Sequence, residues 1–475
     1  MDNTEFRRVA HRFVEWIADY YENLESYPVS AQIKPGDVLE RLKKSPPDVG
    51  ESIEDIFLDF ERTIVPGITH WQHPHFYGSY PAQSTYPSLL AEMLSSAVSS
   101  QSASWQYSPA ATELELRVTD WLRQLLGLPD QFTGTTQESV ATSTLTAILT
   151  ARDKWSQYHV SQKGLYKQKR FVVYASNDAD PELNKVMRIS GLGEENLSHI
   201  ALDEQFAMDP KALSCAIEKD KEKGLVPLMV IATLGAQSTQ AIDPLQKIGV
   251  IARKHKMWIH VDAAYAGAAM ALPEYQYLRD LIQNVHSIVI DPHKWLLTST
   301  DCSVYFVKDL KALQKTLGTL VHYIPASKNK SMAHFNSRGL TEGRRFRALK
   351  LWFVLREYGT QGVQRFIRNH VKLAKQIEEK ILRSPDFKLM APVNFNVVCF
   401  RYIPAKAMKD IEIDSFNHQL LDRLNASGRI FLSPVDLKNQ YALRLVIGQT
   451  YATKESLNIA WQRIVTTAEL LSAEH

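Results

Sequence analysis

The stretch SIVIDPHKWLL, residues 287–297, places a charged lysine between two apolar runs. Its first half is short, apolar and β-branched, which is typical of a strand buried on both faces. Lys294 follows just past the expected strand end, beside His293. Because lysine is seldom buried without a partner, we expect a buried strand that delivers an amine to a site.

Three other runs have the same texture: RFVVYAS at 170–176, LVPLMVIATLG at 225–235 and MWIHVDAA at 257–264. Helical segments separate these runs along the chain. Buried strands that alternate with helices are typical of an α/β fold, in which helices cover both faces of a mostly parallel sheet. We therefore predict an α/β fold.

Other segments flank this region on both sides. Residues 4–24 carry apolar side chains at steps of three and four, as an amphipathic helix does. About the first 80 residues are expected to form a helical arm that could pack across a second subunit. Residues 343–382 predict two helices with a break at 359–362. The expected domains are 1–80 for the arm, 81–355 for a large domain and 356–475 for a small α+β domain.

Composition excludes several classes of protein. The chain has 475 residues and a net charge of +3. This small charge does not indicate a basic surface that would bind nucleic acid or an anionic membrane. Cys215, Cys302 and Cys399 are too few and too scattered for a disulfide framework. The N-terminal residues lack a secretory pattern, and no apolar span of membrane length occurs. We expect a cytoplasmic protein that does not enter the membrane.

Polar residues follow the predicted strands where ligands bind in open α/β sheets. Asp262 ends one strand, and His293 and Lys294 follow another. The segment FTGTTQESVATSTLTAILT, residues 132–150, looks like a Gly/Thr/Ser loop that enters a helix, and such a helix start binds phosphate. Each feature has a plain alternative: a structural carboxylate, a surface lysine or ordinary helix capping. Together, a phosphate anchor, an acid for a ring nitrogen and an amine for an aldehyde indicate pyridoxal phosphate.

Motifs along almost the whole chain carry a family resemblance. They include HPHFYGSYPAQSTYPSLLAEML, SPAATELE, HVDAAYAG, DPHKWLL, DCSVYFVK, GRRFRALKLWFVLREYG and YALRLVIG. With these motifs the chain resembles the pyridoxal-phosphate-dependent group II amino acid decarboxylases, most closely the aromatic-L-amino-acid decarboxylases. The resemblance implies a type I fold with a seven-stranded, mostly parallel sheet. It also implies a homodimer with an exchanged N-terminal arm and an active site at the subunit interface.

The resemblance also implies roles for individual residues. Lys294 would form the internal aldimine, Asp262 would hold the pyridine nitrogen, Ala264 would pack on the ring, and His293 would lie near cofactor and substrate. Further cofactor-binding positions are Ser139, Val140, Ala141, Asp180, Thr233 and Asp291. The substrate-side positions are Tyr77, Tyr80, Pro81, Ala82 and Trp105. Plain core packing is the alternative for the aromatic members of the last group.

The family's proton-donating tyrosine corresponds to Tyr323, in TLVHYIPASKNKSMAHFNSRG at 319–339. This polar segment has the composition of a lid that orders on substrate binding. Its alternative is a surface loop with an incidental tyrosine. Aldehyde synthases related to the family typically carry phenylalanine at this position, so tyrosine favours simple decarboxylation.

The chain departs from the family pattern at several positions. Asp180 stands where a ring-stacking histidine is usual, Ala236 and Gln237 replace a Thr-Thr turn, and Ala82 replaces a threonine of aromatic-substrate members. Val140 and Ala141 remove one hydroxyl from the phosphate loop. The histidines at 70, 73 and 75 lack an accompanying carboxylate or cysteine at metal-ligand spacing, so we expect no metal site there.

The expected reaction is decarboxylation of an L-amino acid to the amine and CO2. An aromatic substrate is favoured: tyrosine, 3,4-dihydroxyphenylalanine, tryptophan or phenylalanine. The alternatives are an oxygen-dependent aldehyde synthase and a degenerate homologue that acts as a binding protein. We also expect a low-dielectric surrounding to lower the pKa of Lys294.

Overall fold

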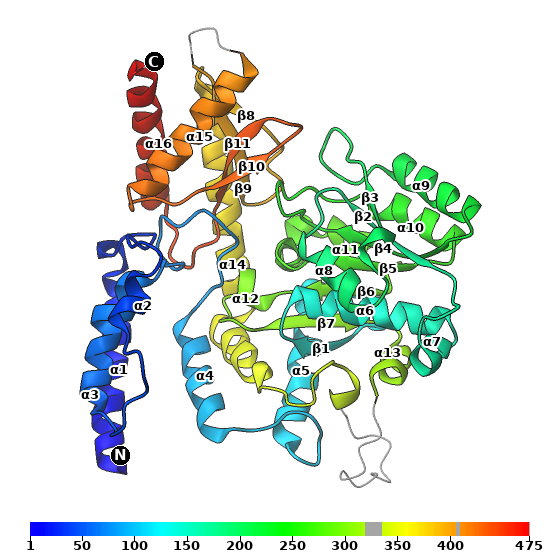
Figure 1. The fold of residues 1–475 in the computed structure, drawn as a ribbon, viewed down its shortest axis with the longest axis horizontal. Helices are drawn as coiled ribbons and strands as arrows, with labels where there is room; N and C mark the ends of the chain where they lie inside the picture. Colours follow the sequence, from blue (N-terminus) through cyan, green and yellow to red (C-terminus); the bar gives the residue numbers. More distant parts are fainter. Residues whose placement is uncertain (319–334, 405–408, 475) are drawn as a thin grey trace. The chain divides into compact units, whose positions relative to one another are not determined.

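The computed structural model describes residues 1–318, 335–404 and 409–474. The chain divides into two compact units (Figure 1). The first comprises Met1–Pro81, Ile377–Met390 and Cys399–His475, and the second comprises Ala82–Gln376 and Ala391–Val398. The second unit contains Lys294, Asp262 and the other predicted cofactor-binding residues.

The second unit is built on a seven-stranded sheet, which confirms the predicted fold class. Its strands are β1(Thr133–Gln137), β2(Phe171–Ser176), β3(Leu197–Ile200), β4(Val226–Thr233), β5(Trp258–Asp262), β6(Ser287–Ile290) and β7(Ser303–Val307). The order is β1-β7-β6-β5-β4-β2-β3. Neighbours from β3 to β6 pair in parallel, whereas β7 is antiparallel to both β6 and β1. All four runs that we identified as strands form β2, β4, β5 and β6.

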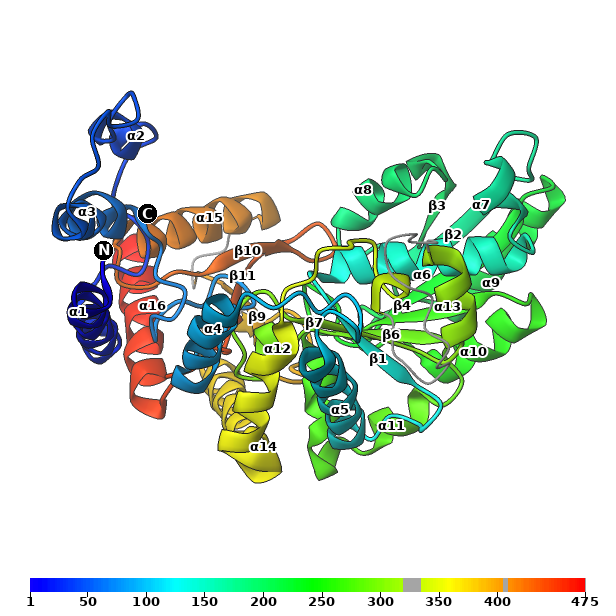
Figure 2. The same ribbon diagram turned by 90° about the horizontal axis from the view of Figure 1, so that it is seen from below.

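Helices cover both faces of this sheet (Figure 2). The α-helices of this unit that precede α14 are α4(Tyr86–Val98), α5(Pro109–Leu126), α6(Val140–Trp155), α7(His159–Lys163), α8(Glu182–Ile189), α9(Pro210–Glu222), α10(Leu245–Lys254), α11(Tyr277–Leu281), α12(Pro292–Trp295) and α13(Leu310–Leu317). α6 and α8 lie over one face, and α5, α10 and α11 lie over the other. Buried side chains of α6, α8, β2 and β4 share one apolar core, which holds the start of α6 and the loop before α8 against the sheet.

The predicted phosphate loop is shorter than the sequence suggested. Residues 133–137 form β1, since their backbone pairs with β7 from Thr133↔Val307 to Gln137↔Ser303. The run TGTTQ is polar and resembles a loop, but pairing with an apolar neighbour makes it a strand. Only Glu138 and Ser139 connect β1 to α6.

The long helical segment after the large sheet is α14(Arg347–Arg383). Gly359 interrupts it with φ 58° and ψ 177°. A left-handed φ is accessible to glycine without a Cβ clash. The predicted break is therefore a kink within α14.

The first unit contains the N-terminal helices α1(Asn3–Glu22), α2(Asp37–Arg41) and α3(Ile53–Asp59) and the C-terminal helices α15(Asp410–Ala426) and α16(Lys454–Glu474). The second sheet of the chain has the order β10(Ser433–Asp436), β11(Tyr441–Val446), β9(Val397–Tyr402) and β8(Phe387–Leu389). The predicted apolar stripe of α1 has a partner within its own chain, because Phe13 stacks on Phe57 at 4.6 Å and Trp16 meets Phe60 at 5.2 Å.

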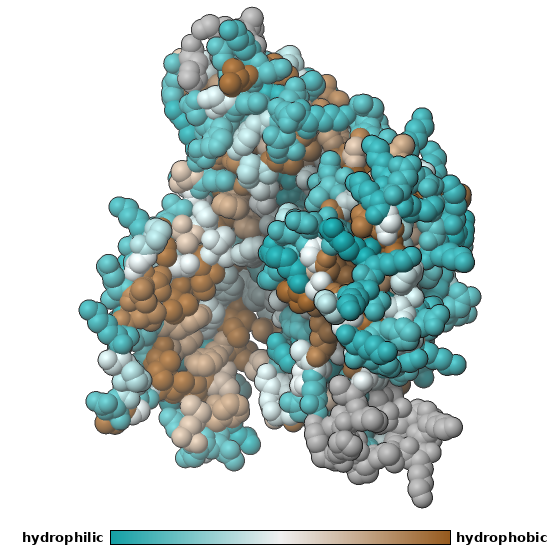
Figure 3. Space-filling view, turned by 45° about the vertical axis from the view of Figure 1, so that its right-hand side comes forward, coloured by the Kyte–Doolittle hydropathy of each residue, from teal (hydrophilic) through white to brown (hydrophobic). Residues whose placement is uncertain are grey.

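Apolar side chains also reach the surface, as the brown patches at the lower left of Figure 3 show. α4 carries five of them, each 45% to 61% exposed: Tyr86, Leu90, Met93, Leu94 and Val98. They recur at helical spacing, so they form a stripe. Among the described residues, no helix has both the length and the apolar composition needed to cross a bilayer.

Candidate active site

Lys294 lies on the short helix α12, directly after the carboxyl end of β6. Asp291 occupies the N-cap of α12, and its Oδ2 lies 3.0 Å from Nζ of Lys294. The other oxygen of Asp291 is buried and has no hydrogen-bond partner among the described residues. The side chain of Lys294 is 25% exposed.

The pKa of Lys294 is raised, not lowered as we expected from the sequence. Burial alone lowers the pKa of this amine, but the carboxylates of Asp291, Asp262 and Asp180 outweigh that effect. A low-dielectric surrounding strengthens the attraction of nearby opposite charges as well as the cost of desolvation. Lys294 is therefore held as a cation.

Asp262 ends β5, next to Thr233 at the end of β4. Its Oδ1 accepts a hydrogen bond from the backbone N–H of Ala264 at 3.0 Å. Burial raises the pKa of Asp262 to about 6; Lys294 opposes this shift, and Asp180 and Asp291 add to it. The carboxyl group can thus exchange a proton near neutral pH.

A cavity lies where α6, the loop before α8 and the ends of β4 and β5 meet. Its lining brings together five of the predicted cofactor-binding residues: Val140, Ala141, Asp180, Thr233 and Asp262. Ala264 packs with Val140 and Val289 in a small apolar cluster beside it.

The start of α6 has the features of a phosphate anchor. Ser139 is the N-cap of α6, and its Oγ accepts a hydrogen bond from the N–H of Thr142 at 3.3 Å. The N-terminal end of a helix attracts anions through its backbone amides and its dipole. The phosphate end of a cofactor can therefore lie here while its ring enters the cavity.

Comparisons with known proteins agree with this geometry. Residues 35–403 match the pyridoxal-dependent decarboxylase conserved domain. The chain belongs to the pyridoxal-dependent decarboxylase family. The family depends on pyridoxal phosphate, and the described residues offer this cofactor an amine at Lys294, a carboxyl group at Asp262 and the N-terminal end of α6.

The similarity to aromatic amino acid decarboxylases covers the whole chain. Tyrosine decarboxylase 2 of Narcissus pseudonarcissus is 40% identical over 100% of this chain and 96% of its own length. A phenylacetaldehyde synthase of Arabidopsis thaliana is 38% identical over 99% of this chain and 97% of its own length. The crystal structure of Catharanthus roseus tryptophan decarboxylase in complex with L-tryptophan superposes with a TM-score of 0.93 at 36% identity, covering 99% of both chains.

The predicted substrate-side residues belong to both units of the chain. Tyr77, Tyr80 and Pro81 belong to the first unit, whereas Ala82 and Trp105 belong to the second. Tyr77 is completely buried, and the ring of Tyr80 lies 4.8 Å from the guanidinium of Arg444. Nε1 of Trp105 donates to Glu113 at 2.7 Å. Tyr323 lies outside the described residues.

Hydrogen bonds of Gln83 and His293 hold the backbone around Lys294. The N–H of Gln83 donates to the carbonyl of His293 at 2.9 Å, and its Oε1 accepts from the N–H of Leu297 at 2.5 Å. Nδ1 of His293 lies 2.7 Å from the carbonyl oxygen of Cys302. Sequence reasoning missed Gln83, although the motif SYPAQSTYP contains it.

Asp243 is a second residue that sequence reasoning missed. Its two carboxylate oxygens accept hydrogen bonds from the backbone N–H groups of Met208 and Thr233, each at 2.7 Å. Asp243 is buried, and burial raises its pKa to about 6. It fixes the end of β4, where Thr233 lines the cavity. In the sequence, the only sign of this role was that Asp243 is acidic and follows the end of β4 by about ten positions.

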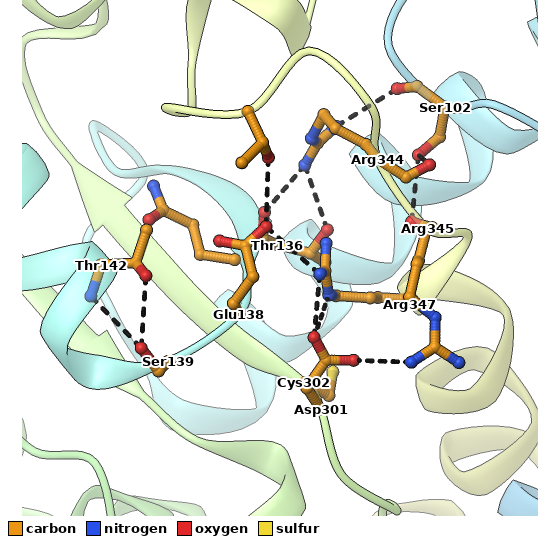
Figure 4. Close-up of polar contacts among 12 residues, drawn as sticks. Ser102, Thr136, Glu138, Ser139, Thr142, Asp301, Cys302, Arg344, Arg345 and Arg347 are labelled. Atoms are coloured by element: carbon orange, nitrogen blue, oxygen red, sulfur yellow. Dashed lines mark hydrogen bonds and ion pairs between the residues drawn. The ribbon is translucent and has the colours of Figure 1, made fainter. Parts of the chain in front are cut away.

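A charged network surrounds the connection between β1 and α6 (Figure 4). Nη2 of Arg347 lies 3.2 Å from Glu138 and 2.8 Å from Asp301. Thr341 Oγ1 donates to Glu138 at 3.2 Å. Glu138 thus has cationic and hydrogen-bonding partners, which reduces the repulsion that a carboxylate beside a phosphate anchor would cause.

Aromatic stacking joins the residue after Lys294 to the wall that contains Ala264. Trp295 and Tyr265 stack with centroids 4.9 Å apart and planes at 7°. Nε1 of Trp295 donates to Nδ1 of His370 on α14 at 2.9 Å, and the hydroxyl of Tyr265 accepts from Asn396 at 2.6 Å. These contacts restrict the direction in which α12 presents its lysine.

Proposed function

We propose that this chain removes the α-carboxylate of an aromatic L-amino acid as CO2 and releases the amine. The carrying observation is the amine of Lys294, 3.0 Å from Asp291, close enough to Asp262 for its carboxylate to raise the pKa of the lysine. The names of relatives that match the whole chain support an aromatic substrate. Tyrosine, 3,4-dihydroxyphenylalanine, tryptophan and phenylalanine are the candidates.

The residues proposed to hold pyridoxal phosphate bind different parts of the cofactor. Ser139, Val140 and Ala141 bind the phosphate group, Ala264 packs on the ring, and Asp262 faces the ring nitrogen. When bound, the cofactor supplies a ring that accepts the electron pair of the broken bond between Cα and the carboxylate. Thr233 and Asp180 complete the lining around the ring.

Side chains of the proposed site also hold or transfer protons. The carboxylate of Asp262 keeps the ring nitrogen protonated, because an adjacent negative charge favours the cationic form. Nζ of Lys294 is the amine that would hold the cofactor through its aldehyde. We propose that His293, next to it on α12, lies near the cofactor and the substrate. We propose Tyr323 as the residue that returns a proton to Cα.

An oxygen-dependent aldehyde synthase is the second candidate. Its support is the phenylacetaldehyde synthase of Arabidopsis thaliana, which matches this chain about as well as the decarboxylases do. A third candidate is a binding protein that keeps the fold without activity. Each candidate predicts different products.

A product analysis separates the three candidates. The protein is loaded with pyridoxal phosphate and incubated with each candidate amino acid, and amine, aldehyde, ammonia and peroxide are measured. We expect amine without peroxide, and we expect none of the products from Lys294→Ala. Aldehyde with peroxide would establish the synthase. Failure to bind the cofactor would exclude both enzymes.

We also propose a homodimer in which a second copy covers the apolar stripe of α4. Exposed apolar stripes of this length usually mark an interface. In the proposed dimer the arm at 1–80 packs on the partner, residues 81–355 form the cofactor domain, and residues 356–475 form the small domain.

A further inference from the structure

Arg347 is the first residue of α14, and only 5% of its side chain is exposed. Its Nη2 lies 3.2 Å from Oε1 of Glu138 and 2.8 Å from Oδ2 of Asp301. Its Nε also donates to Oδ2 of Asp301, at 3.0 Å. One buried guanidinium group thus bonds two carboxylates that lie far apart in the sequence (Figure 4).

The first of these carboxylates belongs to the connection between β1 and α6. Glu138 directly precedes Ser139, the N-cap of α6, and these two residues make up the whole connection. Thr341 Oγ1 also donates to Oε1 of Glu138, at 3.2 Å. Because a helix start binds phosphate through its backbone amides, a contact that holds Glu138 also restricts where those amides lie.

The second carboxylate leads to the lysine. Asp301 directly precedes Cys302, whose carbonyl oxygen accepts a hydrogen bond from the backbone N–H of His293 at 3.3 Å. Nδ1 of His293 also lies 2.7 Å from this oxygen. His293 is the neighbour of Lys294 on α12. The contacts of Arg347 therefore extend through Asp301 to the residue beside the amine.

We propose that Arg347 is a positioning residue that fixes the phosphate anchor at Ser139 relative to the amine of Lys294. This inference rests on the proposed function. A cofactor held at both ends needs these two groups at one spacing, and such a spacing is kept by supporting contacts behind the groups that bind. The planar donors of a guanidinium hold Glu138 and Asp301 in a defined geometry, which a lysine ammonium does not reproduce.

The test is Arg347→Lys, which keeps the positive charge and removes the planar set of donors. Binding of pyridoxal phosphate and of pyridoxal, which lacks the phosphate, is followed by absorbance. The affinity for pyridoxal phosphate should fall roughly 10-fold, the effect of losing one hydrogen bond between charged groups. The affinity for pyridoxal should not change, because it makes no use of the phosphate anchor. Unchanged binding of pyridoxal phosphate would overturn the inference, and so would an equal loss for both compounds, which indicates general damage to the structure.

Arg345→Lys is the matched control. Arg345 pairs with the same carboxylate, since its Nη1 lies 3.3 Å from Oδ1 of Asp301, and its Nη2 lies 2.7 Å from Glu92. Its side chain is 57% exposed. We expect Arg345→Lys to bind both compounds as the unchanged protein does. A 10-fold loss of pyridoxal phosphate binding in this variant as well would overturn the inference, because the effect would then not depend on Arg347.

A second measurement needs no cofactor. The backbone N–H groups of Thr142 and Ser143 bond to Ser139 at the start of α6, and their hydrogen exchange is followed by mass spectrometry. Exchange at these amides should be several-fold faster in Arg347→Lys than in the other two proteins, and equal at 245–254 in α10. Equal exchange at 142–143 would contradict the inference. If the unchanged protein binds neither compound, the proposed function fails, and the exchange rates still decide the role of Arg347.

Discussion

Lys294 and Asp291 form an ion pair within one turn of α12, with Nζ 3.0 Å from Oδ2. Asp291 is nearly inaccessible to solvent, whereas Lys294 is partly open. The pair therefore has a buried anion, and the side chain of its cation is partly exposed. This arrangement holds the lysine in place.

Asp291→Asn should lower the pKa of Lys294, since a directly bonded carboxylate is lost. The pH dependence of anhydride modification at Lys294 in the cofactor-free protein measures this change. Asp309→Asn is the control. Asp309 is also a helix N-cap, and it pairs with Lys154, but the side chains of this pair are more exposed than those of Asp291 and Lys294. An unchanged pKa of Lys294 in Asp291→Asn would show that the pair does not control the amine.

The raised pKa of Asp262 predicts how stability depends on pH. Its pKa is about 6 in the folded protein and about 3.9 in an unfolded chain. The folded state therefore binds this proton more tightly, and the contribution of Asp262 to the free energy of unfolding falls as pH rises from about 4 to about 6. A pKa that differs by one between the folded and unfolded states corresponds to about 1.4 kcal/mol.

Asp262→Asn removes this contribution. Relative to the unchanged protein, the cofactor-free variant should gain stability between pH 4 and pH 7, by up to about 3 kcal/mol. Denaturant unfolding at the two pH values measures the difference. A variant whose stability relative to the unchanged protein is the same at both pH values would show that Asp262 titrates normally.

The stripe on α4 predicts an effect on assembly. Changing both Leu90 and Leu94 to aspartate places two charges on the apolar surface proposed to meet a second copy. Sedimentation should then show the mass of one chain where the unchanged protein shows that of two. Leu382→Asp, at a leucine that is 68% exposed on α14, should leave the mass of two chains. A double variant that remains dimeric would remove α4 from the interface.

Tyr323→Phe tests the proposed proton donor. Without the phenolic proton, amine formation should fall at least about 100-fold, the typical contribution of general acid catalysis, and aldehyde should appear. Chromatography of the products measures both. Tyr166→Phe, at a tyrosine that is 82% exposed, should behave like the unchanged protein. Undiminished amine formation by Tyr323→Phe would assign the proton to another group.

The sequence predicted those parts of the fold that local pattern determines. The strands β2, β4, β5 and β6 are continuous apolar runs, and the kink at Gly359 needs a residue that tolerates positive φ. β1 was not predicted, because TGTTQ has the composition of a loop and becomes a strand only by pairing with β7. No local pattern contains that distant partner.

The residues of the candidate site also include some that the local sequence pattern reveals and some that it does not. Lys294 and Asp262 stand out as charges at the ends of apolar strands, so sequence reasoning found them. Arg347, which pairs with Glu138, lies far along the chain, and Asp243 acts through the backbone of Thr233, so neither was found. The pKa of Lys294 was predicted in the wrong direction because its sign depends on three carboxyl groups that folding brings together.

The most direct test of the central claim is the place where the cofactor becomes attached. The loaded protein is treated with borohydride, which fixes pyridoxal phosphate to the nitrogen that holds it, and is then digested and analysed by mass spectrometry. We predict the reduced cofactor on Lys294 and on no other lysine. Attachment to a different lysine, or recovery of unlabelled peptide 287–297 from protein that has bound the cofactor, would contradict the account.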